Sequence, residues 1–228
     1  MRPNYSIVIP VCNEVESLDI LLGEITNELK SLVGLYEIIF VDDGSNDGTK
    51  EKLDQFKKSY PSFVLNIHLP ERKGQTRALQ EGLGAAKGEY VITLDADLQD
   101  DPHDIGRLVE KISEGYDVVC GWRKTRRDKF LKKVLSKLGN WLGRLISGLP
   151  IHDISCTLRI YRWECLKKLD LAWEGQHRFI PLILFKKGFK IEEMVSNHRE
   201  RRFGNSKYNH KRIFKVIADF FKVLKRNP

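Results

Sequence analysis

The sequence predicts an α/β protein with a mostly parallel, doubly wound sheet flanked by helices. Short apolar runs rich in β-branched residues alternate with segments whose apolar residues recur at helical spacing. This alternation is typical of parallel sheets, in which each crossover passes through a helix. The 228 residues suffice for one substantial core, and neither an internal repeat nor a low-complexity tract interrupts the pattern.

Five apolar runs are predicted as buried strands, at residues 6–9, 37–41, 64–67, 90–94 and 117–120. Between the first two, residues 17–32 carry leucine and isoleucine on one helical face, and residues 46–60 repeat the pattern with Leu53 and Phe56. In open sheets of this class, ligands bind beyond the carboxyl ends of the strands. The residues that follow each strand are therefore the candidates for function.

Acidic residues follow three of the predicted strands. Glu14 comes after the first, Asp42 and Asp43 after the second, and the run that begins at Asp95 after the fourth. A single acidic loop is usually a helix cap or a turn, and Asp43, Ser45 and Asp47 are candidates for that role. Three such loops at one edge would bring like charges together, which a bound cation would offset.

The segment after the fourth strand offers a candidate metal site. Asp95, Asp97 and Gln99 alternate along an extended segment, so their side chains point to one side, and all three offer oxygen donors. Hard oxygen ligands suit Mg²⁺ or Mn²⁺, and such a cation would neutralise a diphosphate leaving group. The alternative is a capped turn at the end of a strand.

The composition limits the partners. Lys and Arg outnumber Asp and Glu by 39 to 31, and the formal charge of +8 points to phosphates, nucleic acid or an anionic membrane surface. The four cysteines form no C-x-x-C pair, which fits a reducing cytosol. No secretory signal and no run of about 18 apolar residues is present, so the chain as given is not expected to span a membrane.

Several motifs together resemble family 2 glycosyltransferases, and within them the polyprenyl-phosphate group that includes dolichol-phosphate mannose synthase and its undecaprenyl relatives. The resemblance covers residues 5–208 and rests on the segments 7–14, 41–45, 73–88, 95–99, 121–123, 153–159, 177–181 and 198–208. It implies a GT-A, Rossmann-like fold. It also implies inverting, Mg²⁺- or Mn²⁺-dependent transfer of a hexose, from a GDP-mannose or UDP-glucose type of donor, to a dolichyl or undecaprenyl phosphate.

The resemblance also implies roles for individual residues. The nucleoside pocket would be lined by Pro10, Cys12, Glu14, Val41 and Asp43, with Asp95 and Ala96 beneath the ribose and diphosphate. Asp97 and Gln99, assisted by Asp95, would hold the metal. Arg123, Lys132 and Arg201 would bind the acceptor phosphate or the diphosphate. A phosphate monoester is already anionic near neutral pH, so Asp97, Arg123 and Arg201 are expected to act by positioning and charge rather than as a general base.

Two basic amphipathic segments are expected on the acceptor side. We expect a catalytic domain over residues 1–208 and a basic amphipathic helix over 209–228. Within the catalytic domain, residues 124–149 combine cationic with apolar side chains. Such helices can lie in a membrane interface or can pack on the core with a solvated basic face. With a lipid acceptor, the first reading predicts a cytoplasmic protein held peripherally on the cytoplasmic face of the membrane.

Three other functions are compatible with parts of the sequence. A family 2 enzyme acting on a soluble or polysaccharide acceptor would keep the same donor site. A nucleic-acid-binding protein would explain the charge, but three acidic loops would repel a phosphate backbone, and no nucleic-acid partner is expected. A nucleotidyltransferase usually has a Gly-rich phosphate loop near the N-terminus, where this chain has Val11-Cys12-Asn13-Glu14.

Overall fold

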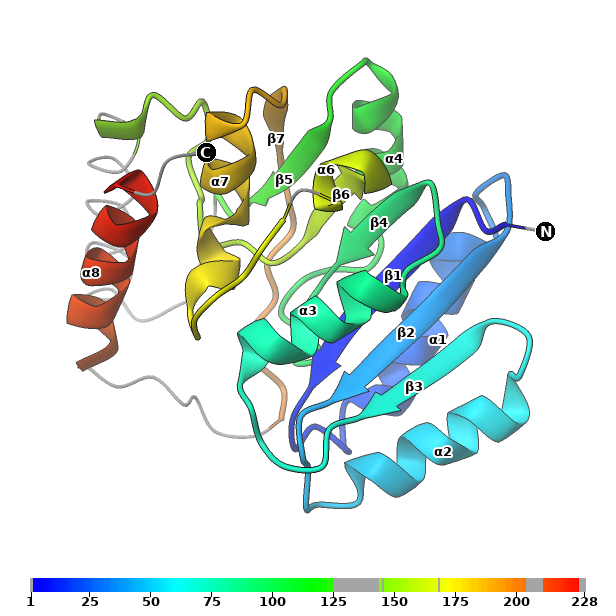
Figure 1. Ribbon diagram of the computed structural model, residues 1–228. Coiled ribbons are helices and arrows are strands. Elements are labelled where there is room, and N and C mark those ends of the chain that lie inside the picture. Colours follow the sequence, from blue (N-terminus) through cyan, green and yellow to red (C-terminus); the bar gives the residue numbers. More distant parts are fainter. Residues whose placement is uncertain (1, 125–143, 145, 168, 204–210, 226–228) are drawn as a thin grey trace.

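The computed structural model describes residues 2–124, 144, 146–167, 169–203 and 211–225. Its centre is a seven-stranded sheet with the strand order β3-β2-β1-β4-β6-β5-β7 (Figure 1). The strands are β1 (Tyr5–Val11), β2 (Tyr36–Asp42), β3 (Val64–His68), β4 (Tyr90–Thr93), β5 (Val118–Trp122), β6 (Arg159–Arg162) and β7 (Ile191–Val195). The five strands predicted from the sequence are thus confirmed as β1 to β5, with small differences at their ends.

The sheet is parallel except for one strand. β1 pairs in parallel with both β2 and β4, β2 with β3, and β5 with β7. β6 lies between β4 and β5 and is antiparallel to both, with Arg159 opposite Thr93 on one side and Cys120 on the other. The prediction of a mostly parallel sheet is therefore confirmed.

Helices cover both faces of the sheet (Figure 1). Core residues of α1 (Leu18–Leu29), α2 (Thr49–Ser59) and α4 (Asp104–Ser113) form one apolar cluster with one side of the strands. Residues of α3 (Gln75–Ala85), α6 (Trp163–Leu166), α7 (Ile180–Lys186) and α8 (Lys211–Lys225) form the cluster on the other side, beside the 3₁₀ helix η1 (Gln176–Phe179). The helices predicted at residues 17–32 and 46–60 are confirmed as α1 and α2.

The strand residues alternate between the two clusters, as the pleat requires. In β1, Ile7 and Ile9 belong to the α1 side and Val8 to the α3 side, and all three are fully buried. Each such side chain contributes about 1.5–3 kcal/mol when it leaves water. Gly82 lets α3 approach the sheet, because a Cβ there would lie 2.4 Å from Val8 Cγ1.

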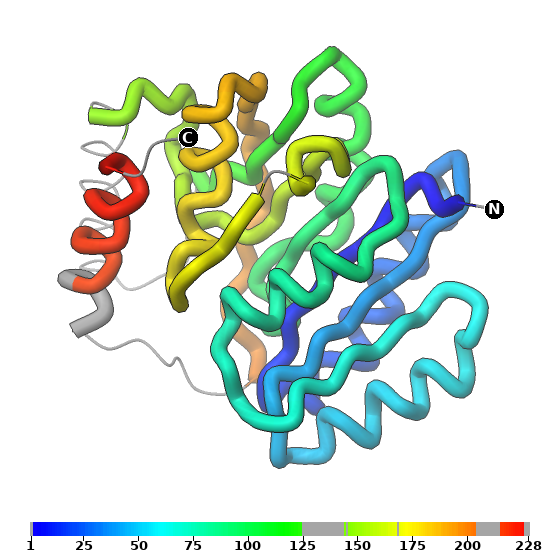
Figure 2. Tube along the Cα trace, in the orientation of Figure 1, coloured from blue at the N-terminus to red at the C-terminus, as the bar shows by residue number. Residues whose placement is uncertain are grey.

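The C-terminal helix α8 packs along the α7 side of the molecule, as both the ribbon and the trace show (Figures 1 and 2). The Phe220 ring lies 6.0 Å from that of Phe179, and Val223 is buried. The Lys186 ammonium donates to the carbonyl oxygens of Val223 and Leu224, at 3.2 and 2.7 Å, where a helix C-terminus attracts positive charge. The helix expected at 209–228 therefore has a buried face.

Most of the second amphipathic segment, at 124–149, lies outside the described residues. In the described part of the chain, we find no helix with the length and apolar character needed to cross a bilayer.

Candidate functional site

The segments singled out in the sequence meet at one edge of the sheet. The carboxyl ends of β1, β2, β4, β5 and β7 all lie there, because these strands run in the same direction. β6 runs the opposite way, so its amino end reaches the same edge, together with the preceding residues 153–158. The predicted convergence of the three acidic loops is therefore confirmed.

The loops after β1 and β2 hold each other through side-chain bonds to backbone. The Asn13 N–H donates to Ser45 Oγ at 2.9 Å, and the Asn46 N–H donates to Asn13 Oδ1 at the same distance. Asn13 adopts a left-handed φ of 55°, which asparagine tolerates better than most residues. Residues 12–14 are thus fixed beside residues 43–46, where the predicted nucleoside pocket lies.

Within that predicted pocket, Val41 and Asp43 are engaged by the protein itself. Val41 is fully buried in the core beneath α3 and lies in β2 between β1 and β3, so its place in the nucleoside pocket stays a prediction. Asp43 is only 3% exposed, and its carboxylate accepts the N–H groups of Lys73 and Gly74 at 2.6–3.0 Å. Asp43 therefore positions the loop that opens α3. Pro10 and Cys12 are partly exposed next to it.

The start of α3 also contacts Asp95, one of the predicted metal ligands, and the segment that leads into η1. Gln75 Nε2 donates to Asp95 Oδ1 at 2.7 Å. Thr76 Oγ1 lies 2.6 Å from His177 Nδ1, and the Thr76 N–H donates to Glu174 Oε2 at 2.9 Å. The 177–181 segment noted in the sequence thus docks on the helix that supports Asp95. Gln75 lies within the 73–88 motif, but the sequence alone does not indicate a role for its side chain.

The end of β4 brings three carboxylates together. Burial and the charges of Asp97 and Asp100 raise the pKa of Asp95 to about 7. Ala96, between Asp95 and Asp97, is buried. Asp100 accepts a hydrogen bond from Thr157 Oγ1 at 2.8 Å. A carboxylate whose ionised form is disfavoured by its neighbours is a group that a divalent cation would stabilise.

Asp97 is paired with Arg201. Arg201 Nη2 lies 2.6 Å from Asp97 Oδ2 and 3.7 Å from Glu14 Oε1. The side chains of Asp97 and Glu14 are each 12% exposed, so this contact is shielded from water. Gln99 donates its backbone N–H to Asp97 Oδ1 at 3.1 Å, across a turn in which Leu98 has a left-handed φ of 60°. The structure thus brings Glu14, Asp97 and Arg201 together. Residues 96–98 form a turn and not the extended segment predicted, and the metal-binding roles of Asp97 and Gln99 stay predictions.

The donor set fits a cation that takes part of its ligands from a substrate. In the described residues, no group of three or more His, Cys, Asp or Glu side chains is arranged to hold a metal by itself. Mg²⁺ commonly binds to one or two carboxylates and completes its shell with phosphate oxygens and water. Asp95 and Asp97 would supply the carboxylates of that arrangement, and burial together with the charges of Asp97 and Asp100 raises the pKa of Asp95 to about 7.

Arg123 is held by a buried ion pair. Its Nε and Nη2 donate to the two carboxylate oxygens of Asp153 at 2.7 and 3.0 Å, and Nη2 also donates to Ser155 Oγ at 3.0 Å. Much of its guanidinium is therefore occupied by its own protein, and its role toward a phosphate stays a prediction. Lys132 lies outside the described residues, so its role stays a prediction too.

Arg159 is a buried cation that the sequence did not distinguish. It is 2% exposed and donates to the carbonyl oxygens of Ile154, His177 and Arg178 at 2.7–3.2 Å, and to the Tyr161 hydroxyl at 3.3 Å. One guanidinium in β6 therefore joins the 153–158 segment to η1. The available signal is its place directly after Leu158, at the end of the 153–159 motif.

Solved structures show to which fold this arrangement belongs. Glucosyl-3-phosphoglycerate synthase from Mycobacterium tuberculosis, in complex with uridine diphosphate, is similar with a TM-score of 0.70 and 20% identity, over 99% of this chain and 81% of that one. The same enzyme in complex with Mn²⁺, UDP-glucose and phosphoglyceric acid gives a TM-score of 0.69 and 21% identity over the same shares. The fold is therefore GT-A, as the resemblance implied.

Sequence comparison defines the family. A model described as glycosyl transferase family 2 matches residues 6–170, and the chain belongs to this family and is a glycosyltransferase. The undecaprenyl-phosphate 4-deoxy-4-formamido-L-arabinose transferases of Yersinia pestis (strain Pestoides F) and Yersinia pseudotuberculosis (serotype O:3) are 38% identical over 223 residues, or 98% of this chain and 68% of each relative. The expected likeness to polyprenyl-phosphate glycosyltransferases is confirmed.

Proposed function

We propose that this glycosyltransferase moves a sugar from a nucleotide diphosphate-sugar to a polyprenyl phosphate, with inversion at the anomeric carbon. The observation that carries the donor half is the set of carboxylates at the end of β4, with Arg201 paired to Asp97 at 2.6 Å. The acceptor half is supported by relatives named as undecaprenyl-phosphate transferases.

In the proposed reaction, the phosphate oxygen of the lipid forms the new bond to the anomeric carbon, while the bond to the nucleoside diphosphate breaks on the opposite face. The chain's own residues bind and orient the two substrates. Residues 10–14 and 43 border the nucleoside, and Asp95 and Asp97 would hold Mg²⁺ or Mn²⁺, which would neutralise the diphosphate. Arg201 would leave Asp97 and bind a phosphate oxygen of a substrate, and no general base is required because the acceptor is already anionic.

We also propose that the protein contacts the cytoplasmic face of the membrane peripherally. On α8, the side opposite the buried Val223 exposes Ile217 and Phe221, at 50% and 46%. Lys215 and Lys222 are exposed beside them. A helix with exposed apolar side chains and flanking lysines suits an interface with anionic headgroups. Flotation with anionic liposomes should carry the wild-type protein at low salt and leave an Ile217→Ser, Phe221→Ser variant behind.

A panel of radiolabelled nucleotide sugars, a short polyprenyl phosphate and Mg²⁺ or Mn²⁺ tests the reaction. The panel should include UDP-glucose, GDP-mannose and a UDP-linked formamido-arabinose, the sugar for which the relatives are named. A chloroform-soluble product is expected with one donor, and Asp97→Asn should abolish it. Glu110→Gln, on the exposed side of α4, should leave it unchanged.

If no donor gives a lipid product and Asp97→Asn alters no sugar transfer, the proposal is wrong. The alternative acceptor class is tested in the same panel with 3-phosphoglycerate and an oligosaccharide. A water-soluble glycosylated product from either would assign the chain to a soluble acceptor instead.

A further inference from the structure

The segment that carries Arg201 runs beside the loop that follows the Asp95–Asp97 carboxylates. Asp100 and His198 form an antiparallel bridge, and the Arg199 N–H donates to the carbonyl oxygen of Gln99 at 2.9 Å. In an extended segment, side chains two residues apart point to the same side. Arg199 and Arg201 therefore both face the carboxylate-rich side of the molecule.

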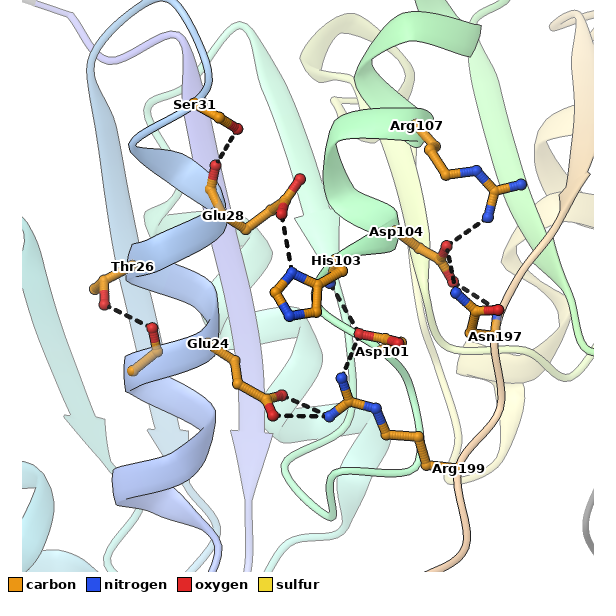
Figure 3. A network of polar contacts seen from close by, with 11 residues as sticks. Glu24, Thr26, Glu28, Ser31, Asp101, His103, Asp104, Arg107, Asn197 and Arg199 are labelled. Atoms are coloured by element: carbon orange, nitrogen blue, oxygen red, sulfur yellow. Dashed lines mark hydrogen bonds and ion pairs between the residues drawn. The ribbon is translucent and has the colours of Figure 1, made fainter.

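Arg199 joins three elements (Figure 3). Its Nη1 lies 2.9 and 2.7 Å from the two carboxylate oxygens of Glu24 on α1, and its Nη2 lies 2.6 Å from Asp101 Oδ1. All three side chains are mostly shielded, with exposures of 23%, 23% and 13%. Charge-assisted bonds of this length in shielded surroundings are among the stronger polar contacts in proteins, and a guanidinium fits two carboxylates in a way that an ammonium does not.

A second contact fixes the same segment one step earlier. The Asn197 N–H donates to Asp104 Oδ2 at 2.6 Å, and its amide donates to Asp104 Oδ1 at 3.3 Å. The chain is thus held at residues 197 and 199, just before Arg201. Because each extended residue spans only about 3.3 Å, the position of Arg199 limits where Arg201 can lie.

We propose that Arg199 is a positioning residue that holds Arg201 against Asp97. The proposal rests on the proposed function for the role of Asp97 in donor binding. Its physical consequence is a competition, because Arg201 and a divalent cation both require the Asp97 carboxylate. With Arg199 removed, the segment relaxes, Arg201 spends less time on Asp97, and a cation meets less opposition there.

Binding of Mn²⁺ alone, followed by the electron paramagnetic resonance signal of free Mn²⁺, tests this without any turnover. Arg199→Ala should tighten Mn²⁺ binding about threefold to tenfold, in the range of one weakened ion pair. Arg201→Gln should tighten it at least as much. In the Arg201→Gln background, Arg199→Ala should add nothing, since the residue through which it acts is gone.

Glu28→Gln is the matched control. Glu28 contacts the imidazole Nδ1 of His103 at 3.1 Å, between the same α1 and the residue before α4. His103 donates its backbone N–H to Asp101, but this bond does not involve the imidazole, and the bonds drawn for the Glu28 carboxylate do not reach residues 197–201 (Figure 3). This variant should leave Mn²⁺ binding unchanged. Arg199→Lys should fall between wild type and Arg199→Ala, because one ammonium cannot serve both carboxylates in the same geometry.

Sugar transfer provides the second readout. Arg199→Ala should lower kcat about tenfold with a smaller change in KM for the donor, since the nucleoside contacts lie elsewhere. The inference is overturned if Arg199→Ala leaves Mn²⁺ binding unchanged, if it still alters binding in the Arg201→Gln background, or if Glu28→Gln has the same effect. If the Mn²⁺ results hold but no lipid is glycosylated, the proposed function fails and the positioning role stands.

Discussion

Replacement of Asp43 by alanine separates the structural from the binding role of this carboxylate. Asp43 accepts the N–H groups of Lys73 and Gly74 from within the protein, at 3% exposure. Hydrogen bonds to a charged group contribute about 1.5–3 kcal/mol each, and buried donors left without an acceptor cost a similar amount. Since water can reach part of the relaxed loop, we expect Asp43→Ala to lower the free energy of unfolding by about 3 kcal/mol.

Asp47 is the matched comparison, because it also accepts two backbone N–H groups. It bonds Thr49 at 3.0 Å and Val15 at 3.2 Å, but it is exposed, so water replaces the lost oxygen. Asp47→Ala should therefore cost about 1 kcal/mol, as for a helix cap. Urea unfolding of both variants, with calorimetric titration of UDP, measures stability and binding separately. Equal losses of stability for the two variants would refute the argument from burial.

Three further predictions concern packing, pH and ligand binding. Gly82→Ala should destabilise the protein by about 2 kcal/mol in urea unfolding, because its Cβ would meet Val8 Cγ1 at 2.4 Å. Gly84→Ala, with nothing within 4 Å, should stabilise by about 0.5–1 kcal/mol; the reverse order would contradict the packing. The pKa of Asp95 is raised to about 7 on folding, so its protonated form favours the folded state. The thermal midpoint of the metal-free protein should therefore fall as pH rises from about 4 to about 7. Asp95→Asn should make the midpoint less dependent on pH in this range. An unchanged slope in this variant would show that Asp95 does not titrate there. Mn²⁺ with UDP should raise the thermal midpoint, because ligands that bind only the folded state stabilise it, and excess EDTA should reverse the rise. An equal rise in the Asp97→Asn variant would count against Asp97 as a metal ligand.

The strands beneath the site were predictable because each signals itself locally. β1, β2 and β4 are apolar runs of β-branched residues, and the acidic residues directly follow them. β6 is not among the strands that the sequence predicts, and only its first residue lies within the 153–159 motif. It has four residues, two of them arginines, and its partners β4 and β5 are both distant in sequence and antiparallel to it. No local period marks such a strand.

The contacts of the candidate site were predicted less well than its residues. Asp97 and Arg201 were each proposed, but their pairing depends on how β7 places residues 197–201, which no spacing reveals. The sequence does not distinguish Arg199 from the many arginines on the surface, because its partner Glu24 is 175 positions away. The family resemblance implies that Arg123 binds a phosphate, whereas the structure shows its guanidinium bonded to Asp153.

The single reversed strand has a mechanical consequence. β6 is bonded to β4 on one side and to β5 on the other. The strand that precedes Asp95 and Asp97 and the strand that precedes Arg123 therefore belong to one continuous sheet. Two substrates bound at its edge would be held at a separation fixed by strand spacing, about 4.8 Å per strand. Rotation of one side of the sheet against the other would break these strand pairings, so we expect the residues at this edge to keep their spacing when ligands bind.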